Sequence, residues 1–127
     1  MVKIMFVCLG NICRSPMAEC VMSKMIKDNN LQDCVSVASS ATSFEEVGNP
    51  IYPPAQRKLR EKGVEVLAHR AVRITPKDAK EYDYIVGMEE RNVRAINQIV
   101  GDTGKVYRLL DFSSNPRDIA DPWWTGN

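Results

Sequence analysis

Short apolar runs alternate with longer stretches of mixed character along this chain. Four of the runs are predicted to form β-strands: Lys3–Val7, Cys34–Ala38, Tyr84–Val86 and Val106–Leu110. In the first, apolar residues occupy consecutive positions from Ile4 to Val7, which is typical of a strand buried on both faces of a parallel sheet. A further short extended piece is expected at Ala71–Ile74.

Helices are predicted between these strands. The first begins at about residue 16 and runs to about Asn29, with Ser15 as its N-cap and Pro16 at the first helical position. Its apolar stripe, at three-to-four spacing, comprises Met17, Cys20, Val21 and Met25. The other helices expected are one from Pro54 to a stop at Gly63, a short one capped by Thr75 and Pro76, and one over Glu89–Val100 ended by Gly101.

Strands that alternate with helices imply a parallel sheet with helices on both faces. Ligands of such sheets bind beyond the carboxyl ends of the strands, where the strand order reverses. The loop after the first strand is therefore the expected place for a functional site. A polar stretch at residues 40–52 is expected to line the same crevice, with Phe44 and Tyr52 as ring contacts or as ordinary surface residues. The glutamates expected to be solvated or paired charges are Glu19, Glu45, Glu46 and Glu89.

The loop after the first strand carries reactive side chains. Cys8 and Arg14 are separated by five residues and lie between the first predicted strand and the first predicted helix. Gly10 can take a positive φ without strain, and Asn11 tolerates the left-handed region better than most residues. Such a turn points backbone N–H groups inward, where they bind an oxyanion together with the helix N-terminus. Arg14 adds a planar fork that matches two oxygens of a phosphate.

The same positive field acts on the Cys8 thiol. Helix N-termini and neighbouring cations favour the thiolate form of a cysteine, and the Ser15 hydroxyl can donate a hydrogen bond to that thiolate. Cleavage of a phosphate ester through a phosphocysteine is therefore the leading hypothesis. A cysteine at a strand end that only fills the core is the simpler alternative.

A leaving alcohol or phenol needs a proton, and the candidate donor is Asp121. A proline follows it and stiffens the turn, and next come Trp123 and Trp124, which offer an aromatic wall for a planar ring. An ordinary turn with tryptophans in the core explains the same residues. Asp111 and Asp118 are rival proton donors on the same stretch.

Several motifs follow one another in a characteristic order. They are Cys8–Ser15 with Pro16–Glu19, Ser39–Ser43 with Val47–Pro50, Ala68–Ala71, Asp83–Val86 with Met88-Glu89, and Asp121-Pro122. In these motifs, over nearly its whole length, the chain resembles the low-molecular-weight protein tyrosine phosphatases. We therefore predict a single three-layer α/β domain over residues 1–127, with a four-stranded parallel sheet in the flavodoxin-like order 2-1-3-4 between helices.

The resemblance implies the chemistry of the site. Cys8 would be the nucleophile and Arg14 the phosphate clamp. Asp121 would protonate the leaving oxygen and then activate water against the phosphocysteine. No metal and no cofactor is implied, because Arg14 and the loop amides supply the positive charge.

The resemblance also implies supporting roles. Ser15 would support the sulfur, and Ser39 and His69 would hold the loop in shape through Asn11. The residues implied to bind phosphate are Leu9, Gly10, Asn11, Ile12, Cys13 and Ser15. In the family, a cysteine at the position of Cys13 can form a disulfide with the nucleophile and shield it from over-oxidation. A small buried side chain is the alternative for Cys13.

Two features depart from the family pattern. Trp123 and Trp124 stand where tyrosines usually follow the Asp-Pro pair. The chain also stops at Asn127, whereas family members usually continue into one more helix. The chain is therefore expected to be a fragment, or an unusually short member that lacks the last helix.

Other activities remain alternatives. Phosphoarginine phosphatases of this fold carry threonine where this chain has Ile12, whose branched apolar side chain suits an aromatic ring better than a guanidinium. Arsenate reductases need a cysteine pair far along the chain, but the cysteines here are Cys8, Cys13, Cys20 and Cys34. A phosphate-binding or phosphocysteine carrier domain without hydrolysis would not need Asp121.

Composition narrows the partners and the location. The 127 residues carry a formal net charge of +1, which gives no reason to expect nucleic acid or a membrane surface as partner. No apolar run is long enough to cross a bilayer. Four cysteines without a dense disulfide framework indicate a reducing, cytoplasmic location. The expected partners are phosphotyrosine-containing proteins, and the sequence does not indicate an oligomeric state.

Overall fold

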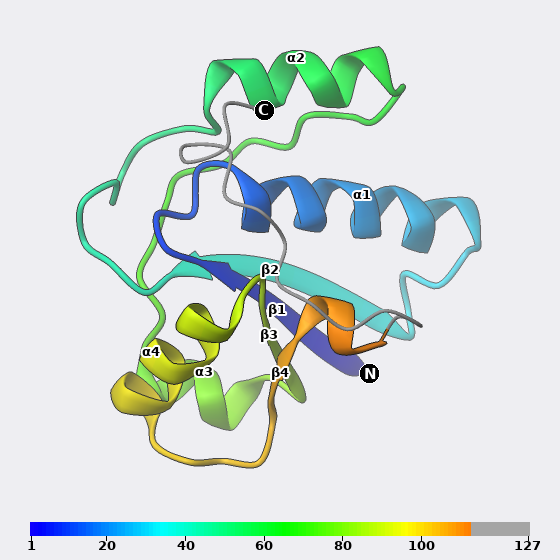
Figure 1. The fold of residues 1–127 in the computed structure, drawn as a ribbon. Helices are drawn as coiled ribbons and strands as arrows, with labels where there is room; N and C mark the ends of the chain where they lie inside the picture. The colour runs from blue at the N-terminus through cyan, green and yellow to red at the C-terminus, as the bar shows by residue number, and fades with distance from the viewer. Residues whose placement is uncertain (113–127) are drawn as a thin grey trace.

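Parallel strands form the centre of the molecule (Figure 1). They are β1 (Val2–Cys8), β2 (Val35–Ala41), β3 (Tyr84–Gly87) and β4 (Val106–Arg108). They pair in the order β2-β1-β3-β4 in this computed structural model, which describes residues 1–112. Central β1 places Phe6 beside Ser39 of β2 and Val86 of β3. The predicted parallel sheet and its predicted strand order are confirmed.

Helices cover both faces of the sheet, as predicted (Figure 1). They are α1 (Arg14–Asp28), α2 (Pro53–Glu61), α3 (Pro76–Glu81) and α4 (Glu90–Val100), followed by a 3₁₀ turn, η1 (Leu109–Phe112). α1 lies along one face with α2 outside it, whereas α3 and α4 cover the other face. No helix within residues 1–112 combines the length and the apolar character that a membrane crossing requires.

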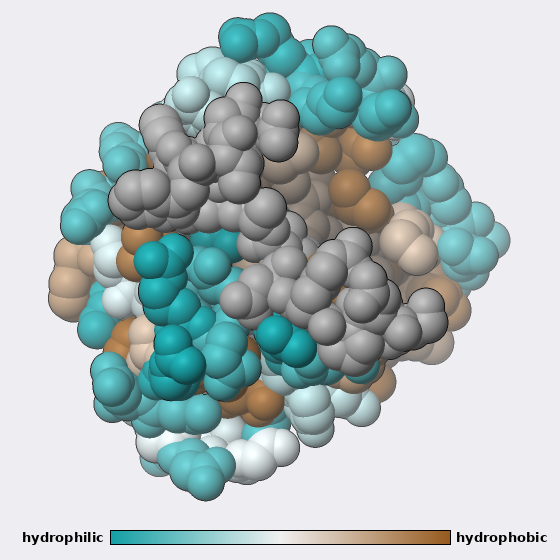
Figure 2. All heavy atoms as spheres, viewed as in Figure 1, coloured by the Kyte–Doolittle hydropathy of each residue, from teal (hydrophilic) through white to brown (hydrophobic). Residues whose placement is uncertain are grey.

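The core consists of separate layers on the two faces of the sheet, because successive side chains of a strand point to opposite faces. The layer next to α3 and α4 contains Met5, Val7, Ile74, Ala79, Ile85 and Ile96. The layer next to α1 contains Phe6, Cys8, Val86 and Met88. Cys8 therefore lies on the α1 face, at the carboxyl end of the central strand. Polar residues cover most of the described surface in the view of Figure 2.

The start of the first helix differs from its prediction. α1 begins at Arg14 with Cys13 as its N-cap, so Ser15 and Pro16 lie inside the first turn. Ser15 is therefore not the N-cap, and its hydroxyl bonds to Cys8 and Asn11 instead of capping the helix. An N-cap residue uses its side-chain oxygen to accept from the first backbone N–H groups of the helix, and this oxygen is already engaged.

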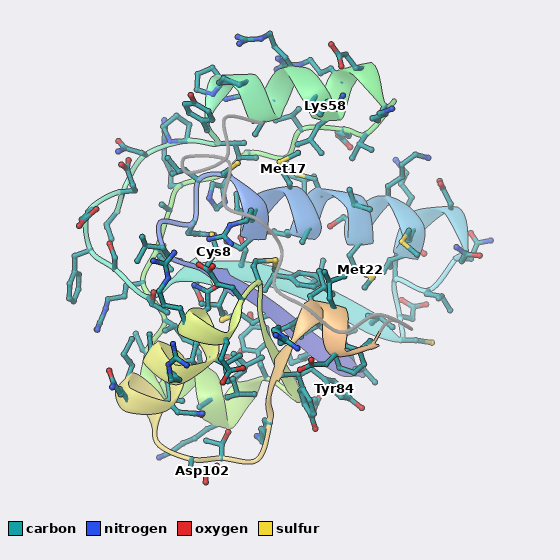
Figure 3. All side chains as sticks on the ribbon, in the orientation of Figure 1. Cys8, Met17, Met22, Lys58, Tyr84 and Asp102 are labelled. Carbon is teal, nitrogen blue, oxygen red and sulfur yellow. The ribbon has the colours of Figure 1, made fainter. Side chains whose placement is uncertain are left out.

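The predicted apolar stripe of the first helix was partly wrong. Val21 is 42% exposed and Met25 is 53% exposed. The helix is instead covered from two directions, so that one row of residues faces α2 and a neighbouring row faces the sheet. Figure 3 shows Met17 between α1 and α2, and Met22 on the side of the sheet.

Other boundaries moved by a few residues. β2 continues to Ala41 because it pairs with β1 as far as Cys8. The fourth strand ends at Arg108, where the chain enters η1. Thr75 caps α3 as predicted, in a capping box with Asp78. The predicted extended piece at 71–74 contributes a single parallel bridge between Arg73 and Ala41.

Candidate active site

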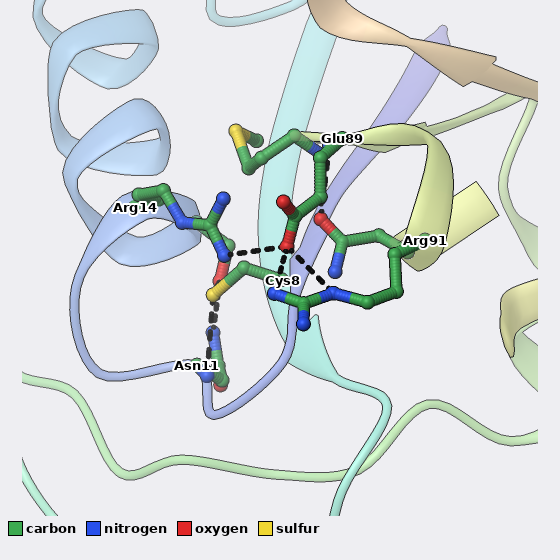
Figure 4. A network of polar contacts seen from close by, with 8 residues as sticks. Cys8, Asn11, Arg14, Glu89 and Arg91 are labelled. Carbon is green, nitrogen blue, oxygen red and sulfur yellow. Dashed lines mark hydrogen bonds and ion pairs between the residues drawn. The ribbon is translucent and has the colours of Figure 1, made fainter. Parts of the chain in front are cut away.

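Cys8 lies where β1 ends and the chain turns back into α1 (Figure 4). Its side chain is buried, at 3% exposure. The backbone N–H of Asn11 donates to Cys8 Sγ across 3.3 Å, and Ser15 Oγ lies 2.9 Å from the same sulfur. A backbone donor from the middle of the loop and a hydroxyl from the first turn of α1 thus both contact the thiol.

The hydroxyl of Ser15 is directed toward that sulfur. Asn11 Nδ2 donates to Ser15 Oγ at 2.9 Å, which occupies an acceptor position of the hydroxyl and leaves its proton to be donated. The two acceptors within reach are Cys8 Sγ at 2.9 Å and the Ser40 carbonyl oxygen at 3.4 Å. The nearer acceptor is the sulfur, so Ser15 is placed to donate to a Cys8 thiolate.

Asn11 fixes the shape of the loop. It is completely buried and has a φ of 58°, in the left-handed region. Its Nδ2 donates to Ser15 and to Ser39, at 2.9 Å each, and its Oδ1 accepts from the Val72 N–H at 3.1 Å. The Asn11 carbonyl oxygen lies 2.6 Å from His69 Nε2. Segments far apart in the sequence therefore hold one strained residue in place.

Of the two residues that could adopt a positive φ in this loop, Asn11 does so, and Gly10 is not among the glycines that share that conformation. Gly10 matters for close approach instead, because a Cβ at this position would lie 3.3 Å from Glu46 Cγ. The absent side chain lets the segment at residue 46 cover the loop.

Ser39 extends the network to partly buried Glu19 on α1. Its Oγ accepts from Asn11 and donates to Glu19 Oε1 at 2.6 Å. Glu19 lies one helical turn after Ser15, on the same face of α1. Glu19 was predicted to be a solvated or paired charge, and the sequence did not identify it as part of this network. Its four-residue spacing from Ser15 is the signal that could have found it.

Arg14 is buried at 8% exposure, at the first position of α1. Its Nη2 donates to Glu89 Oε1 at 3.3 Å. The same oxygen accepts from Arg91, from Nη2 at 2.8 Å and from Nε at 3.3 Å. Figure 4 shows the Glu89 carboxylate between the two guanidinium groups, close to Cys8. Sequence reasoning did not place Arg91 at the site.

A turn between β3 and α4 holds Glu89 in position. Asn92 is buried, at 2% exposure, and its Oδ1 accepts from the backbone N–H groups of Met88 and Glu89 at 3.1 and 3.0 Å. A Cβ at Gly87 would lie 3.0 Å from Asn92 Cβ, so the turn is also tightly packed. The position of the Glu89 carboxylate therefore depends on a turn that has little room to move.

The remaining residues of the loop differ in exposure. Leu9 is 42% exposed, whereas Ile12 and Cys13 are each 8% exposed. Cys13 packs in the cluster that joins α1 to α2, and none of the four cysteines, all of which lie within residues 1–112, forms a disulfide. Phe44 is 70% exposed and stacks against the Arg73 guanidinium, whose carbon lies 4.2 Å from the ring centroid.

One candidate proton donor falls within the described residues. Asp111 is exposed, and its Oδ1 accepts from Arg108 Nη2 at 2.8 Å. Asp118, Asp121, Trp123 and Trp124 lie outside the described residues. Within residues 1–112, no three His, Cys, Asp or Glu side chains gather in a way that could hold a metal ion.

The site combines a buried cysteine at a strand end, a loop held by Asn11 and a buried arginine at the helix start. We compared the chain with known proteins. The sequence matches the family described as low molecular weight phosphotyrosine protein phosphatase over residues 3–127. The chain belongs to this family. Its members are phosphoric monoester hydrolases, so the predicted family and enzyme class are confirmed.

Relatives of this phosphatase come from bacteria and animals. Low molecular weight protein-tyrosine-phosphatase YfkJ of Bacillus subtilis is 34% identical over 131 residues, which cover 100% of this chain and 84% of that protein. A low molecular weight phosphotyrosine protein phosphatase of Rattus norvegicus is 44% identical over 129 residues, covering 98% of this chain and 81% of that protein.

Solved structures agree with the fold. The crystal structure of YfkJ from Bacillus subtilis has a TM-score of 0.94 at 34% identity and covers 100% of this chain and 82% of that chain. A structure described as the drosophila arginine phosphatase has a TM-score of 0.89 at 28% identity, covering 99% of this chain and 83% of that chain.

Proposed function

We propose that this phosphatase hydrolyses phosphotyrosine in proteins through a phosphocysteine formed on Cys8. The observation that carries the proposal is the environment of Cys8 Sγ, which lies 3.3 Å from the Asn11 N–H nitrogen and 2.9 Å from Ser15 Oγ. Hydrogen bonds to a sulfur favour its anionic form, and the thiolate is the nucleophilic form of cysteine. The start of α1 adds its positive dipole end to the same position.

In the first step, the Cys8 thiolate attacks phosphorus. The S–P bond forms while the bond from phosphorus to the tyrosine oxygen breaks, and the departing oxygen takes a proton from Asp121. Arg14 and the loop amides bind the phosphoryl oxygens and stabilise the charge that they carry in the transition state. The role of Asp121 rests on the Asp-Pro motif of the family.

In the second step, water replaces the sulfur. Asp121, now a carboxylate, accepts a proton from the water as its oxygen attacks phosphorus, and the S–P bond breaks. The released electron pair returns to Cys8, where the Ser15 hydroxyl stabilises the thiolate as a leaving group. We further propose that residues 1–127 act as one phosphatase domain in a reducing, cytoplasmic environment, since the four cysteines form no dense disulfide framework.

Ile12 is proposed to favour an aromatic substrate. Its branched apolar side chain is 8% exposed within the loop, and it offers no polar atom to a guanidinium. We propose Trp123 and Trp124 as the aromatic wall of the substrate cleft. Cys13 is proposed to protect Cys8 by forming a disulfide with it under oxidation.

A paired assay with phosphotyrosine and phosphoarginine peptides tests the proposed function, with vanadate as a competitor. We expect hydrolysis of phosphotyrosine, inhibition by vanadate and no turnover by Cys8→Ser. Asp121→Asn should lower kcat by about 10² to 10⁴. Asp111→Asn is the matched control, because Asp111 is exposed and paired with Arg108. Turnover by Cys8→Ser, or a preference for phosphoarginine, would contradict the proposal.

A further inference from the structure

One carboxylate oxygen at the active site accepts hydrogen bonds from two arginines. Glu89 Oε1 accepts from Arg14 Nη2 at 3.3 Å, and it accepts from Arg91 Nη2 at 2.8 Å and from Arg91 Nε at 3.3 Å. The closer contact, which is made by two nitrogens, therefore belongs to Arg91. Both Arg91 nitrogens donate to this single oxygen, and hydrogen bonds between two charged groups are stronger than those between neutral groups.

A carboxylate in this position needs a compensating charge. The side chains of Arg14 and Glu89 are 7% and 13% exposed, so water screens their charges weakly. The proposed substrate carries a phosphoryl group with a charge of about −1.5 to −2 at neutral pH. An uncompensated Glu89 carboxylate would repel this group and would also compete with it for the guanidinium of Arg14.

We propose that Arg91 is a positioning residue of the phosphate site that acts through Glu89. It neutralises the Glu89 carboxylate and holds it at a fixed place, so that the Arg14 guanidinium is oriented but still able to bind phosphoryl oxygens. Together Arg14, Glu89 and Arg91 keep a net positive charge beside Cys8. This assignment rests on the proposed function, since it concerns the binding of the substrate phosphate.

The placement of Arg91 supports such a role. It lies in the first turn of α4, directly after the turn that buried Asn92 fixes through the N–H groups of Met88 and Glu89. Its own side chain is 52% exposed, so the Arg91 charge is accessible to salt while the Glu89 charge is not. Replacing Arg91 should therefore change electrostatics at the site without opening a cavity in the core.

The matched control is Arg94. It is exposed and lies on the same helix, one turn further along, so Arg94→Ala removes the same charge from α4. We expect Arg91→Ala to raise the KM for an aryl phosphate about five- to twentyfold, with kcat changed less than about threefold. Arg94→Ala should change either constant less than about twofold. Arg91→Lys keeps the charge and should restore KM to within about threefold of the wild type.

Direct phosphate binding separates this inference from the proposed function. In a Cys8→Ser background, the dissociation constant of inorganic phosphate can be measured by calorimetry without turnover. Arg91→Ala should weaken this binding about five- to twentyfold at low salt, and less at high salt. If the wild type failed to hydrolyse aryl phosphates, the proposed function would be wrong, while the binding series would still test Arg91.

A double-mutant cycle tests whether Arg91 acts through Glu89. In a Glu89→Gln background no carboxylate remains to be neutralised or held in place, so Arg91→Ala should then weaken phosphate binding clearly less than it does when Glu89 is present. An equal loss in both backgrounds would mean that Arg91 acts on the anion without Glu89, by its own charge or by direct contact, which overturns the positioning role. An Arg91→Ala variant no weaker than Arg94→Ala would overturn it as well.

Discussion

The backbone N–H of Asn11 points at Cys8 Sγ, across 3.3 Å, because Asn11 adopts a φ of 58°. This left-handed conformation costs an ordinary residue about 1 to 2 kcal/mol. It persists here because the Asn11 side chain is bonded to Ser15, Ser39 and Val72. The hydrogen bonds that stabilise the loop are thus also the means by which a backbone donor reaches the sulfur.

Replacing Asn11 should lower the free energy of unfolding in two separable ways, by removing side-chain hydrogen bonds and by adding backbone strain. Asn11→Gly removes the side-chain hydrogen bonds but permits the positive φ, and we expect it to lower the free energy of unfolding by about 2 to 3 kcal/mol. Asn11→Ala removes the same bonds and adds backbone strain, which should cost about 1 kcal/mol more. Urea unfolding of the two variants measures the difference. Equal stabilities for the glycine and alanine variants would show that strain at this position is negligible.

Ser39→Ala should lower the stability of the protein. The change leaves a buried Asn11 amide hydrogen and the Glu19 carboxylate without the Ser39 hydroxyl, so we expect a loss of about 1.5 to 3 kcal/mol in the free energy of unfolding. Ser43→Ala is the control, because the Ser43 hydroxyl bonds an exposed backbone N–H, and its cost should stay within about 0.5 kcal/mol. A Ser39→Ala variant as stable as Ser43→Ala would contradict a stabilising role for the hydrogen bonds of Ser39.

Local sequence patterns were sufficient for most of the fold. The strand before Cys8, the loop and the helix after it follow from an apolar run, a tolerant asparagine and a helix-starting sequence. The strand order and the involvement of Ser39 and His69 were predicted from the resemblance to the phosphatase family. Local patterns in a single sequence do not show which distant segments pair with one another. Their contacts with Asn11 span 28 and 58 residues of chain.

What the sequence did not predict depends on tertiary contacts. The pairing of Arg14 with Glu89 spans 75 residues, and it exists because β1 and β3 are neighbours whose carboxyl ends meet at one edge of the sheet. The exposure of Val21 and Met25 has a similar origin, since α2 covers one side of α1 and the sheet covers another. Helical periodicity identifies an apolar face but not how many neighbours that face has.

Gly87→Ala should displace Glu89 by shifting the turn between β3 and α4. A Cβ at Gly87 would lie 3.0 Å from Asn92 Cβ and 3.3 Å from Val93 Cγ2, so the turn that carries Glu89 must shift. We expect a loss of about 1 to 3 kcal/mol in the free energy of unfolding and weaker binding of inorganic phosphate. Calorimetric titration of phosphate measures the second effect.

The control for this change is Gly104→Ala. Gly104 has a φ of 72°, and a Cβ added there would meet no atom within 4 Å. Its replacement therefore costs backbone strain of about 1 kcal/mol but should leave phosphate binding unchanged. Phosphate binding that is unaffected by Gly87→Ala would show that the turn does not position Glu89.

Cys20 should behave as a structural thiol that resists alkylation. It is 2% exposed, and burial raises the pKa of its thiol, against a Leu67 backbone hydrogen bond that lowers it. Cys34 is exposed. Iodoacetamide at pH 8 should therefore modify Cys34 well before Cys20, and urea should make the two rates similar, as peptide mass spectrometry can follow. Modification of folded Cys20 at the rate of Cys34 would contradict this assignment.

The raised pKa of Cys20 also predicts a dependence of stability on pH. Because the folded protein holds this thiol protonated more strongly than the unfolded chain does, its contribution is complete below the unfolded pKa of about 8.5. The contribution is lost as the pH rises from there through the folded pKa. The free energy of unfolding of the wild type should therefore fall more steeply above pH 8.5 than that of Cys20→Ala. Burial also raises the pKa of Tyr82, so the free energy of unfolding of both proteins falls with pH through this residue. The contribution of Cys20 is therefore given by the difference between the two pH profiles.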